Sequence, residues 1–256
     1  MSNLVIPDDG NIGSASDPDA LAISSSGIVT MASGNGYRFN GIRTFTSTGD
    51  FTFTKSTNVS AILVYVTGAG GGGAGGQSTY NGGGSGGAGA TAIKWLTSGI
   101  DSGIACHVGA KGAKGAHGSG GSDGANSTFG PSSGGTFTQI VGGAGKGGTD
   151  LDVTTDTGCL GGTATGGDLN LFGGDGHKIY GGATSTDIAG MMGGGASFWG
   201  GGGATGSIYH GSSYTQFHGE DARAYGAGGG AGRDPGNSTG VGGDGAHGII
   251  VVYEYI

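Results

Sequence analysis

The stretch GAKGAKGAHGSGGSDGANST, residues 109–128, places a glycine at every third position from Gly109 to Gly124 and contains no proline. A period of three matches the polyproline II conformation, which has three residues per turn and no internal hydrogen bonds. Every backbone N–H and C=O of such a helix needs a partner outside it. Neighbouring helices can supply these partners if they approach closely, which glycine permits and which proline, lacking the N–H, would impair. The stretch therefore predicts left-handed, glycine-edged helices that pack side by side.

Glycine is the dominant residue of the chain, with 69 among 256 residues, and only seven of them precede Gly68. Such a content is typical of collagen or of low-complexity chains. Collagen does not fit, because the chain has four prolines and the period of three breaks repeatedly. Disorder does not fit either, because apolar runs such as AILVYV (61–66) and GIIVVYEY (248–255) bracket the glycine tracts.

These apolar runs predict strands. In RTFTSTGDFTFT (43–54), phenylalanines alternate after Gly49-Asp50, which indicates a hairpin with its turn at that dipeptide. ATAIKWL (90–96) and GIACHV (103–108) indicate a second hairpin. Run 61–66 indicates a central strand, and the C-terminal run supplies the last of about six strands.

The glycine-rich excursions leave this framework and return to it, and they cover 68–89, 109–148 and 161–248. They show no helical period, and glycine costs an α-helix about 1 kcal/mol per residue. The predicted fold class is therefore all-β. It is a short-stranded antiparallel sandwich framework that carries glycine-rich, polyglycine-II-like loops.

Residues 1–42 differ from the rest, because short apolar runs alternate there with Gly, Ser and Asp turns. Each run is too short to build a core within one chain. We expect a short fibre-like attachment segment in which several chains interlock; the alternative is a partly ordered N-terminal extension. Residues 43–256 are expected to form one glycine-rich domain.

Charge excludes several partners. Ten Lys and Arg against 18 Asp and Glu leave a net charge of −8 and no basic stripe, which argues against nucleic acid and anionic lipid. No run approaches the 18 or so apolar residues of a membrane span, and no secretory signal is evident, so we expect no membrane insertion. Cys106 and Cys159 match no metal spacing and are expected to be small buried or free residues, with a disulfide as the alternative.

Glycine-rich sequence also produces motif matches by chance. GGSGG (83–87) fits the nucleophile-elbow pattern but has glycine where a strand and a helix are required. GGAGKGG (142–148) lacks the Ser or Thr of a P-loop. The stretches 173–181 and 242–250 approach the calcium-binding nonapeptide but lack its Asp at the sixth position. We therefore predict no catalytic residue, no cofactor and no metal.

Aromatic residues gather in two neighbouring stretches, 191–203 and 206–226, and the edges of packed glycine helices have no place for them. Tyr and Trp offer large, rigid contact areas that suit protein or sugar partners. The alternative is packing in small satellite cores beneath long loops. The candidate binding residues are Trp199, Tyr209, Tyr214, Phe217, Tyr225, His210 and Phe198.

The order of segments resembles the glycine-rich C-terminal domain of bacteriophage tail-fibre proteins. The resemblance rests on a series that includes FTFTKSTNVSAILVYVTGAGGGGAGG (51–76), GATAIKWLTSGIDSGIACHVGAKGAKG (89–115) and GGDGAHGIIVVYEY (242–255). It covers roughly residues 43–256 and implies a receptor-binding role in attachment to host bacteria. It also implies a threefold fibre, so a homotrimer is expected, located in the virion after synthesis in the host cytoplasm.

The function expected from this resemblance is that of a non-enzymatic tail fibre or fibre tip. Its partners would be a bacterial surface protein or glycan and other tail-fibre or baseplate proteins. One alternative is a polysaccharide depolymerase, which needs paired carboxylates in a groove, although the only glutamates are Glu220 and Glu254. Another is an ice-binding or structural polyglycine II protein, for which the threonines are too irregular.

Overall fold

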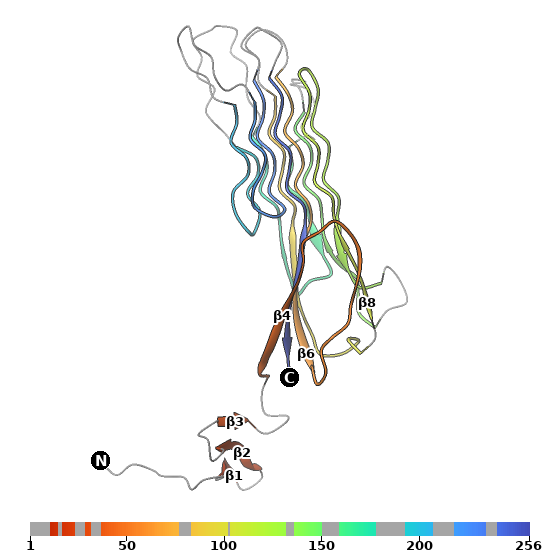
Figure 1. The fold of residues 1–256 in the computed structure, drawn as a ribbon, viewed down its shortest axis with the longest axis vertical. Helices are drawn as coiled ribbons and strands as arrows, with labels where there is room; N and C mark the ends of the chain where they lie inside the picture. The colour runs from red at the N-terminus through yellow and green to blue at the C-terminus, as the bar shows by residue number, and fades with distance from the viewer. Residues whose placement is uncertain are drawn as a thin grey trace, which may run out of the picture.

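The computed structural model describes residues 11–14, 17–23, 29–31, 37–76, 83–101, 103–131, 136–149, 159–177, 193–206, 218–233 and 240–256. All regular elements within these ranges are strands, and they include no helix that could cross a membrane. Figure 1 shows a β-sandwich labelled β4, β6 and β8, with a bundle of extended glycine-rich segments standing on one end of it.

The sandwich consists of two antiparallel five-stranded sheets, as the sequence predicted. The first sheet has the order β12 (Leu169–Leu171), β7 (Thr91–Leu96), β6 (Ala61–Thr67), β13 (Ile249–Tyr255), β4 (Phe39–Phe45). The second has the order β11 (Ala164–Thr165), β10 (Ile140–Gly142), β9 (Ser127–Phe129), β8 (Ile104–Val108), β5 (Gly49–Phe53). A separate three-stranded sheet contains β1 (Asn11–Ser14), β2 (Asp17–Ile23) and β3 (Val29–Met31).

The core lies between the two five-stranded sheets. Alternate residues of β6 and β13, among them Val64 and Val252, point inward and meet Phe53 and Phe129 of the second sheet. All four side chains are at most 1% exposed. The C-terminal strand β13 lies between β6 and β4, so the last residues of the chain complete the sheet that the first run of the domain begins. The division of the chain after residue 42 stays a prediction.

Both predicted hairpins are wrong. β4 pairs with β13 and β5 pairs with β8, so the chain crosses between the sheets at the place where a turn was expected. Gly49 lies inside β5 opposite Val108. The crossing lets Phe45 and Phe51 pack from opposite sheets, with ring centroids 5.4 Å apart. β7 and β8 likewise belong to different sheets.

The sandwich also has more strands than the six predicted. The short strands β9 to β12 interrupt the glycine excursions and extend both sheets. Each has two or three residues, too few for periodicity to reveal.

Within the described residues, the bundle contains twelve extended segments that alternate in direction and exchange hydrogen bonds laterally. They are 68–76, 83–90, 109–118, 119–126, 143–149, 159–163, 172–177, 193–197, 200–206, 218–223, 226–233 and 240–248. We refer to this bundle as the lattice.

Segment 68–76 shows how the lattice is built. Successive N–H groups donate to three different neighbours, and the pattern then repeats: the bonds run from Gly71 to Gly87, from Gly72 to Ser122 and from Gly73 to Gly243, at 2.8–2.9 Å. Its carbonyl groups accept from three further segments, 109–118, 143–149 and 226–233. Six bonded neighbours around one helix with three residues per turn make a hexagonal arrangement.

Segments 83–90 and 226–233 also have six bonded neighbours each, and these two are bonded to each other and to 68–76. The other nine described segments form a closed ring around this central trio. The inner residues of the trio are Gly, Ala and Ser and are buried. A Cβ at most of these glycines would overlap a neighbour's backbone carbonyl, so the glycine content follows from the close approach of backbones.

Candidate functional site

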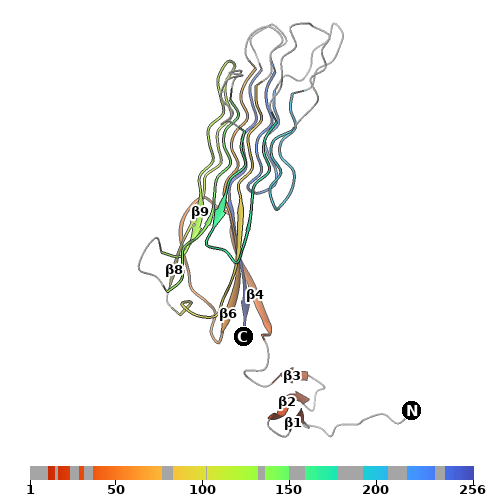
Figure 2. The same cartoon turned by 180° about the vertical axis from the view of Figure 1, so that it is seen from behind.

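The lattice has one end attached to the sandwich and one far end. β6 continues into segment 68–76, segment 83–90 continues into β7, and segment 240–248 continues into β13. The view from behind shows the C-terminus at the other end of the sandwich, away from the lattice (Figure 2).

Ten described residues mark the far end. They are Gly76, Gly83, Thr149, Cys159, His177, Gly193, Gly206, His218, Arg233 and Gly240. Five stretches that lie outside the described residues fall between successive pairs of them in the sequence: 77–82, 150–158, 178–192, 207–217 and 234–239. The residues that flank five separate excursions therefore share one end of a single scaffold.

The candidate binding residues divide into two groups. Tyr209, His210, Tyr214 and Phe217 belong to 207–217 and lie outside the described residues. Phe198, Trp199 and Tyr225 are described, and they occupy two turns at the sandwich end of the lattice. The two turns are linked, since Ser197 Oγ donates to the Tyr225 carbonyl at 2.6 Å.

Trp199 makes internal contacts. Its Nε1–H donates to Thr67 Oγ1 at 2.9 Å, and Thr67 is bonded in turn to Thr91 Oγ1 at 2.8 Å. The Trp199 ring lies 6.2 Å from that of Tyr65, and the Phe198 ring lies 5.8 Å from it. Trp199 therefore anchors the lattice to β6, whereas Phe198 remains half exposed.

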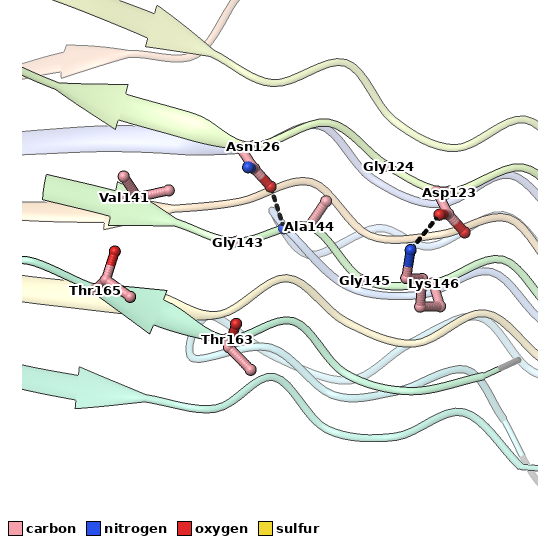
Figure 3. A pocket seen from close by; sticks show the side chains of 10 residues that line it. All are labelled: Asp123, Gly124, Asn126, Val141, Gly143, Ala144, Gly145, Lys146, Thr163 and Thr165. Atoms are coloured by element: carbon pink, nitrogen blue, oxygen red, sulfur yellow. Dashed lines mark hydrogen bonds and ion pairs between the residues drawn. The ribbon is translucent and has the colours of Figure 1, made fainter. Parts of the chain in front are cut away.

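Polar side chains join neighbouring helices of the outer ring. Asp123 and Asn126 lie three residues apart on one helix and accept the N–H groups of Gly147 and Ala144 on the next, both at 2.8 Å. Figure 3 shows the bond from Ala144 to Asn126. Burial raises the pKa of Asp123, but the hydrogen bonds from Lys146 and Gly147 N–H and the Lys146 charge outweigh it, so the pKa lies below its ordinary value. Asp123 is thus held as the carboxylate that accepts these bonds.

The same arrangement recurs at Asp244 and His247. Asp244 accepts the Lys114 N–H at 2.8 Å and pairs with Lys111 Nζ at 2.6 Å, and His247 Nδ1 accepts the Lys111 N–H at 3.2 Å. Burial raises the pKa of Asp244, but its bonds to Lys111 and Lys114 lower it by more, so the pKa lies below its ordinary value. Burial, aided by the Lys111 charge, lowers the pKa of His247.

Sequence reasoning missed these contacts, although the signal was present. DGAN at 123–126 and DGAH at 244–247 repeat an acceptor pair at the helical period of three. The second repeat lies in one of the near matches to the calcium-binding nonapeptide. Its Asp and His serve here to bond adjacent helices.

A groove of about 440 Å³ runs beside the first of these pairs. Figure 3 shows Asp123, Asn126 and Lys146 along it, with Thr163 and Thr165 from the neighbouring segment and β11. Lys146 Nζ lies 2.7 Å from Asp123 Oδ2. The charged groups of the groove therefore neutralise each other, and its lining is polar.

A second groove, of about 570 Å³, crosses β5, β8 and β9. It contains a bond of 2.7 Å between His107 Nδ1 and Asp50 Oδ1 beside Cys106. Cys106 is only 3% exposed, and burial raises the pKa of its thiol to about 12. A thiol with that pKa stays protonated, so it does not supply the thiolate of a cysteine nucleophile.

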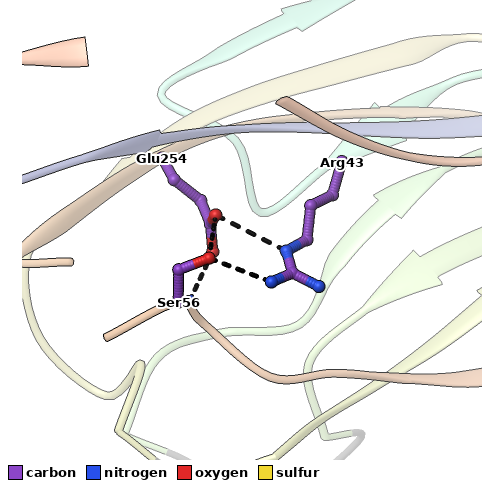
Figure 4. A network of polar contacts seen from close by, with 3 residues as sticks. All are labelled: Arg43, Ser56 and Glu254. Atoms are coloured by element: carbon purple, nitrogen blue, oxygen red, sulfur yellow. Dashed lines mark hydrogen bonds and ion pairs between the residues drawn. The ribbon is translucent and has the colours of Figure 1, made fainter. Parts of the chain in front are cut away.

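The carboxylate of Glu254 is hydrogen-bonded within the sandwich. It accepts the Ser56 N–H at 2.8 Å and the Ser56 hydroxyl at 2.7 Å, and Arg43 Nε lies 3.4 Å away (Figure 4). The residue is 2% exposed. One of the two glutamates considered for a depolymerase thus has a structural role. Across the described residues, no group of three or more His, Cys, Asp and Glu side chains is arranged to hold a metal.

The comparison with family models matches residues 46–255 to a glycine-rich domain, and the chain belongs to this family. The match includes all of the lattice and every strand of the sandwich except β4. No curated protein matches the chain.

Proposed function

We propose that this chain is a receptor-binding tail-fibre protein or fibre tip of a bacteriophage, which attaches to a bacterial surface protein or glycan without catalysis. Its place would be the virion, after synthesis in the host cytoplasm. Residues 1–42 would join it to further copies, as a homotrimer, and to other tail-fibre or baseplate proteins.

The observation that carries this proposal is that the described residues flanking five excursions share the far end of the lattice. The interior of the lattice is restricted to small residues by the close approach of its backbones. Residues outside the regular segments are free of that restriction, and connecting loops on a rigid scaffold are where binding residues concentrate. The excursions contain aromatic residues suited to recognition, including Tyr80, Tyr180, Tyr209, Tyr214 and Phe217.

The described grooves favour binding over catalysis. Their ionisable groups are paired with each other or with backbone N–H groups, and the thiol beside the second groove is held protonated. A hydrolase of polysaccharides needs two carboxyl groups roughly 5–10 Å apart on either side of the substrate. The Glu254 carboxylate is buried and bonded to Ser56, so it does not fill that role.

Binding of the fluorescently labelled full chain to a panel of bacteria tests the proposal, with surface glycan or surface protein removed from parallel samples. The double substitution Tyr214→Ala and Phe217→Ala should weaken binding by about thirtyfold, the loss of a typical hot spot. Phe172→Ala is the matched control, since it removes an exposed ring that is not among the candidate binding residues. Equal binding by both variants would place recognition away from 207–217, and absence of binding across the panel would refute the function.

A further inference from the structure

The outer face of the first sheet carries apolar and aromatic residues in continuous cross-strand rows. Because Val64, Val66, Ile250 and Val252 point into the core, the alternate residues of β6 and β13 point outward. Directly paired residues of antiparallel strands share a face. The outward rows are Leu169–Ile93–Tyr65–Val251–Thr44, then Trp95–Leu63–Tyr253–Ile42, then Ala61–Tyr255–Phe39. None of these positions holds a charged side chain.

Ring contacts join the rows into one surface. Trp95 lies 5.0 Å from both Tyr37 and Tyr255, and Tyr255 lies 6.1 Å from Phe39. At the lattice end of the sheet, the turn that carries Trp199 covers this face. The rest of the surface, which we call the aromatic face, extends to the edge strand β4.

The aromatic face is open toward the edge strand β4, where Tyr37 is 50% exposed, Phe39 55% and Ile42 53%. Leu169, on the opposite edge strand, is 51% exposed. A side chain of this size has roughly 200 Å² to bury, so each leaves on the order of 100 Å² in water. Together with partly exposed neighbours such as Trp95, the face reaches the several hundred Å² that soluble monomers rarely exceed.

We infer that the aromatic face is the contact surface for a second copy of this chain. Four side chains that each leave about 100 Å² in water give on the order of 400 Å², about half of the roughly 800 Å² that one partner contributes to a stable interface, and the partly exposed neighbours add to it. Its lack of charge and its aromatic content match the buried centre of an interface between identical subunits. A sugar-binding surface would need several polar groups beside the rings to bond hydroxyl groups, and the outward rows offer only Thr44, the tyrosine hydroxyls and the Trp95 indole N–H.

The path of the chain also favours a second copy of this chain as the partner of the aromatic face. Residues 1–36 reach the sandwich at Tyr37, on the aromatic face itself, and Arg38 is bonded through its backbone to Ile256 at the base of the sheet. Association of copies through 1–42, as proposed above, would hold their aromatic faces close together and raise their effective concentration. The inference rests on that part of the proposed function, but it does not depend on host binding.

The test is the mass of the intact chain in solution by analytical ultracentrifugation, between about 1 and about 100 µM. The parent should sediment at a multiple of the 24.3 kDa chain mass. Ile42→Lys places a charge on the edge strand β4, within the exposed part of the aromatic face, and should weaken association at least about tenfold. Leu160→Lys is the matched control, because Leu160 is 45% exposed and lies in the lattice, and it should leave the mass unchanged.

Ile42 is exposed, so the lysine variant should fold, and an unchanged melting temperature of the lattice would verify this. The milder variant Ile42→Ala should weaken association in the same direction. A parent of monomer mass throughout the range would overturn the inference, as would an Ile42→Lys variant that keeps the parent's mass. The second result would leave assembly through 1–42 in place, and host binding is measured separately in both cases.

Discussion

Replacing Gly73 with alanine adds one methyl group at the centre of the lattice. The Gly73 N–H donates to the Gly243 carbonyl, and its carbonyl accepts from Gly115, both at 2.8 Å. A Cβ at this position would overlap the carbonyl of Gly230. That carbonyl accepts the Gly243 N–H at 2.8 Å, so the methyl group can fit only if this bond is stretched or broken.

The cost follows from two contributions. Overpacking a tight interior typically costs about 1–3 kcal/mol. Leaving a buried N–H without its acceptor costs about 1–3 kcal/mol more. Six bonded neighbours prevent segment 68–76 from moving aside, so we expect the free energy of unfolding to fall by about 3 kcal/mol, roughly 150-fold in the unfolding equilibrium.

Gly201→Ala is the matched control, because it lies in an outer helix of the same lattice and no atom is within 4 Å of the added Cβ. It should be neutral or stabilise the protein by up to about 1 kcal/mol, since it restricts the unfolded chain. Denaturant unfolding followed by tryptophan fluorescence, at one protein concentration, measures both variants. Coincident unfolding midpoints for the two variants would refute the enclosed position of segment 68–76.

Three further predictions concern side chains around the lattice and sandwich. Because the pKa of His247 is lowered in the folded protein, its contribution to the free energy of unfolding is complete above pH of about 6.5 and is lost as the pH falls below that value. The lowered pKa of Asp244 adds a second loss of stability below pH of about 4. Unfolding measured against pH should therefore show both losses, and His247→Asn should remove only the first. The Cys106 thiol, with its pKa raised to about 12, should resist a thiol reagent at pH of about 8 until the protein is unfolded. Trp199→Phe keeps a ring but removes the hydrogen bond to Thr67, so the melting curve should report a loss of about 1 kcal/mol in the free energy of unfolding. An unchanged curve would show that this bond does not anchor the lattice to β6.

The local sequence pattern predicted well which kinds of segment make up the fold. The glycine period at 109–124 predicted a laterally bonded helix, and the alternation at Phe51 and Phe53 predicted a strand with one buried face. The pairing of strands was not predictable from the same pattern. Gly49-Asp50 has the composition of a turn, but nothing local specifies that β5 pairs with β8. The packing of Phe45 against Phe51 from opposite sheets accompanies the pairing of β5 with β8.

The candidate site stays a prediction, and its aromatic residues were grouped by their proximity in sequence. Trp199 is near Tyr209 along the chain, but its ring packs at the sandwich end on Tyr65. The outward surface of the first sheet was not foreseen, since its rows combine residues from five strands that are scattered between Phe39 and Tyr255.

The sequence by itself determined that this protein has extended glycine helices and an all-β framework, because a period of three and a period of two are properties of single segments. Tertiary structure alone decided that three segments form the centre of a hexagonal lattice, that the described residues flanking five excursions share one end, and that one sheet face stays open. These are outcomes of which backbones lie side by side, and that choice depends on hydrogen bonds and burial between residues far apart in the chain.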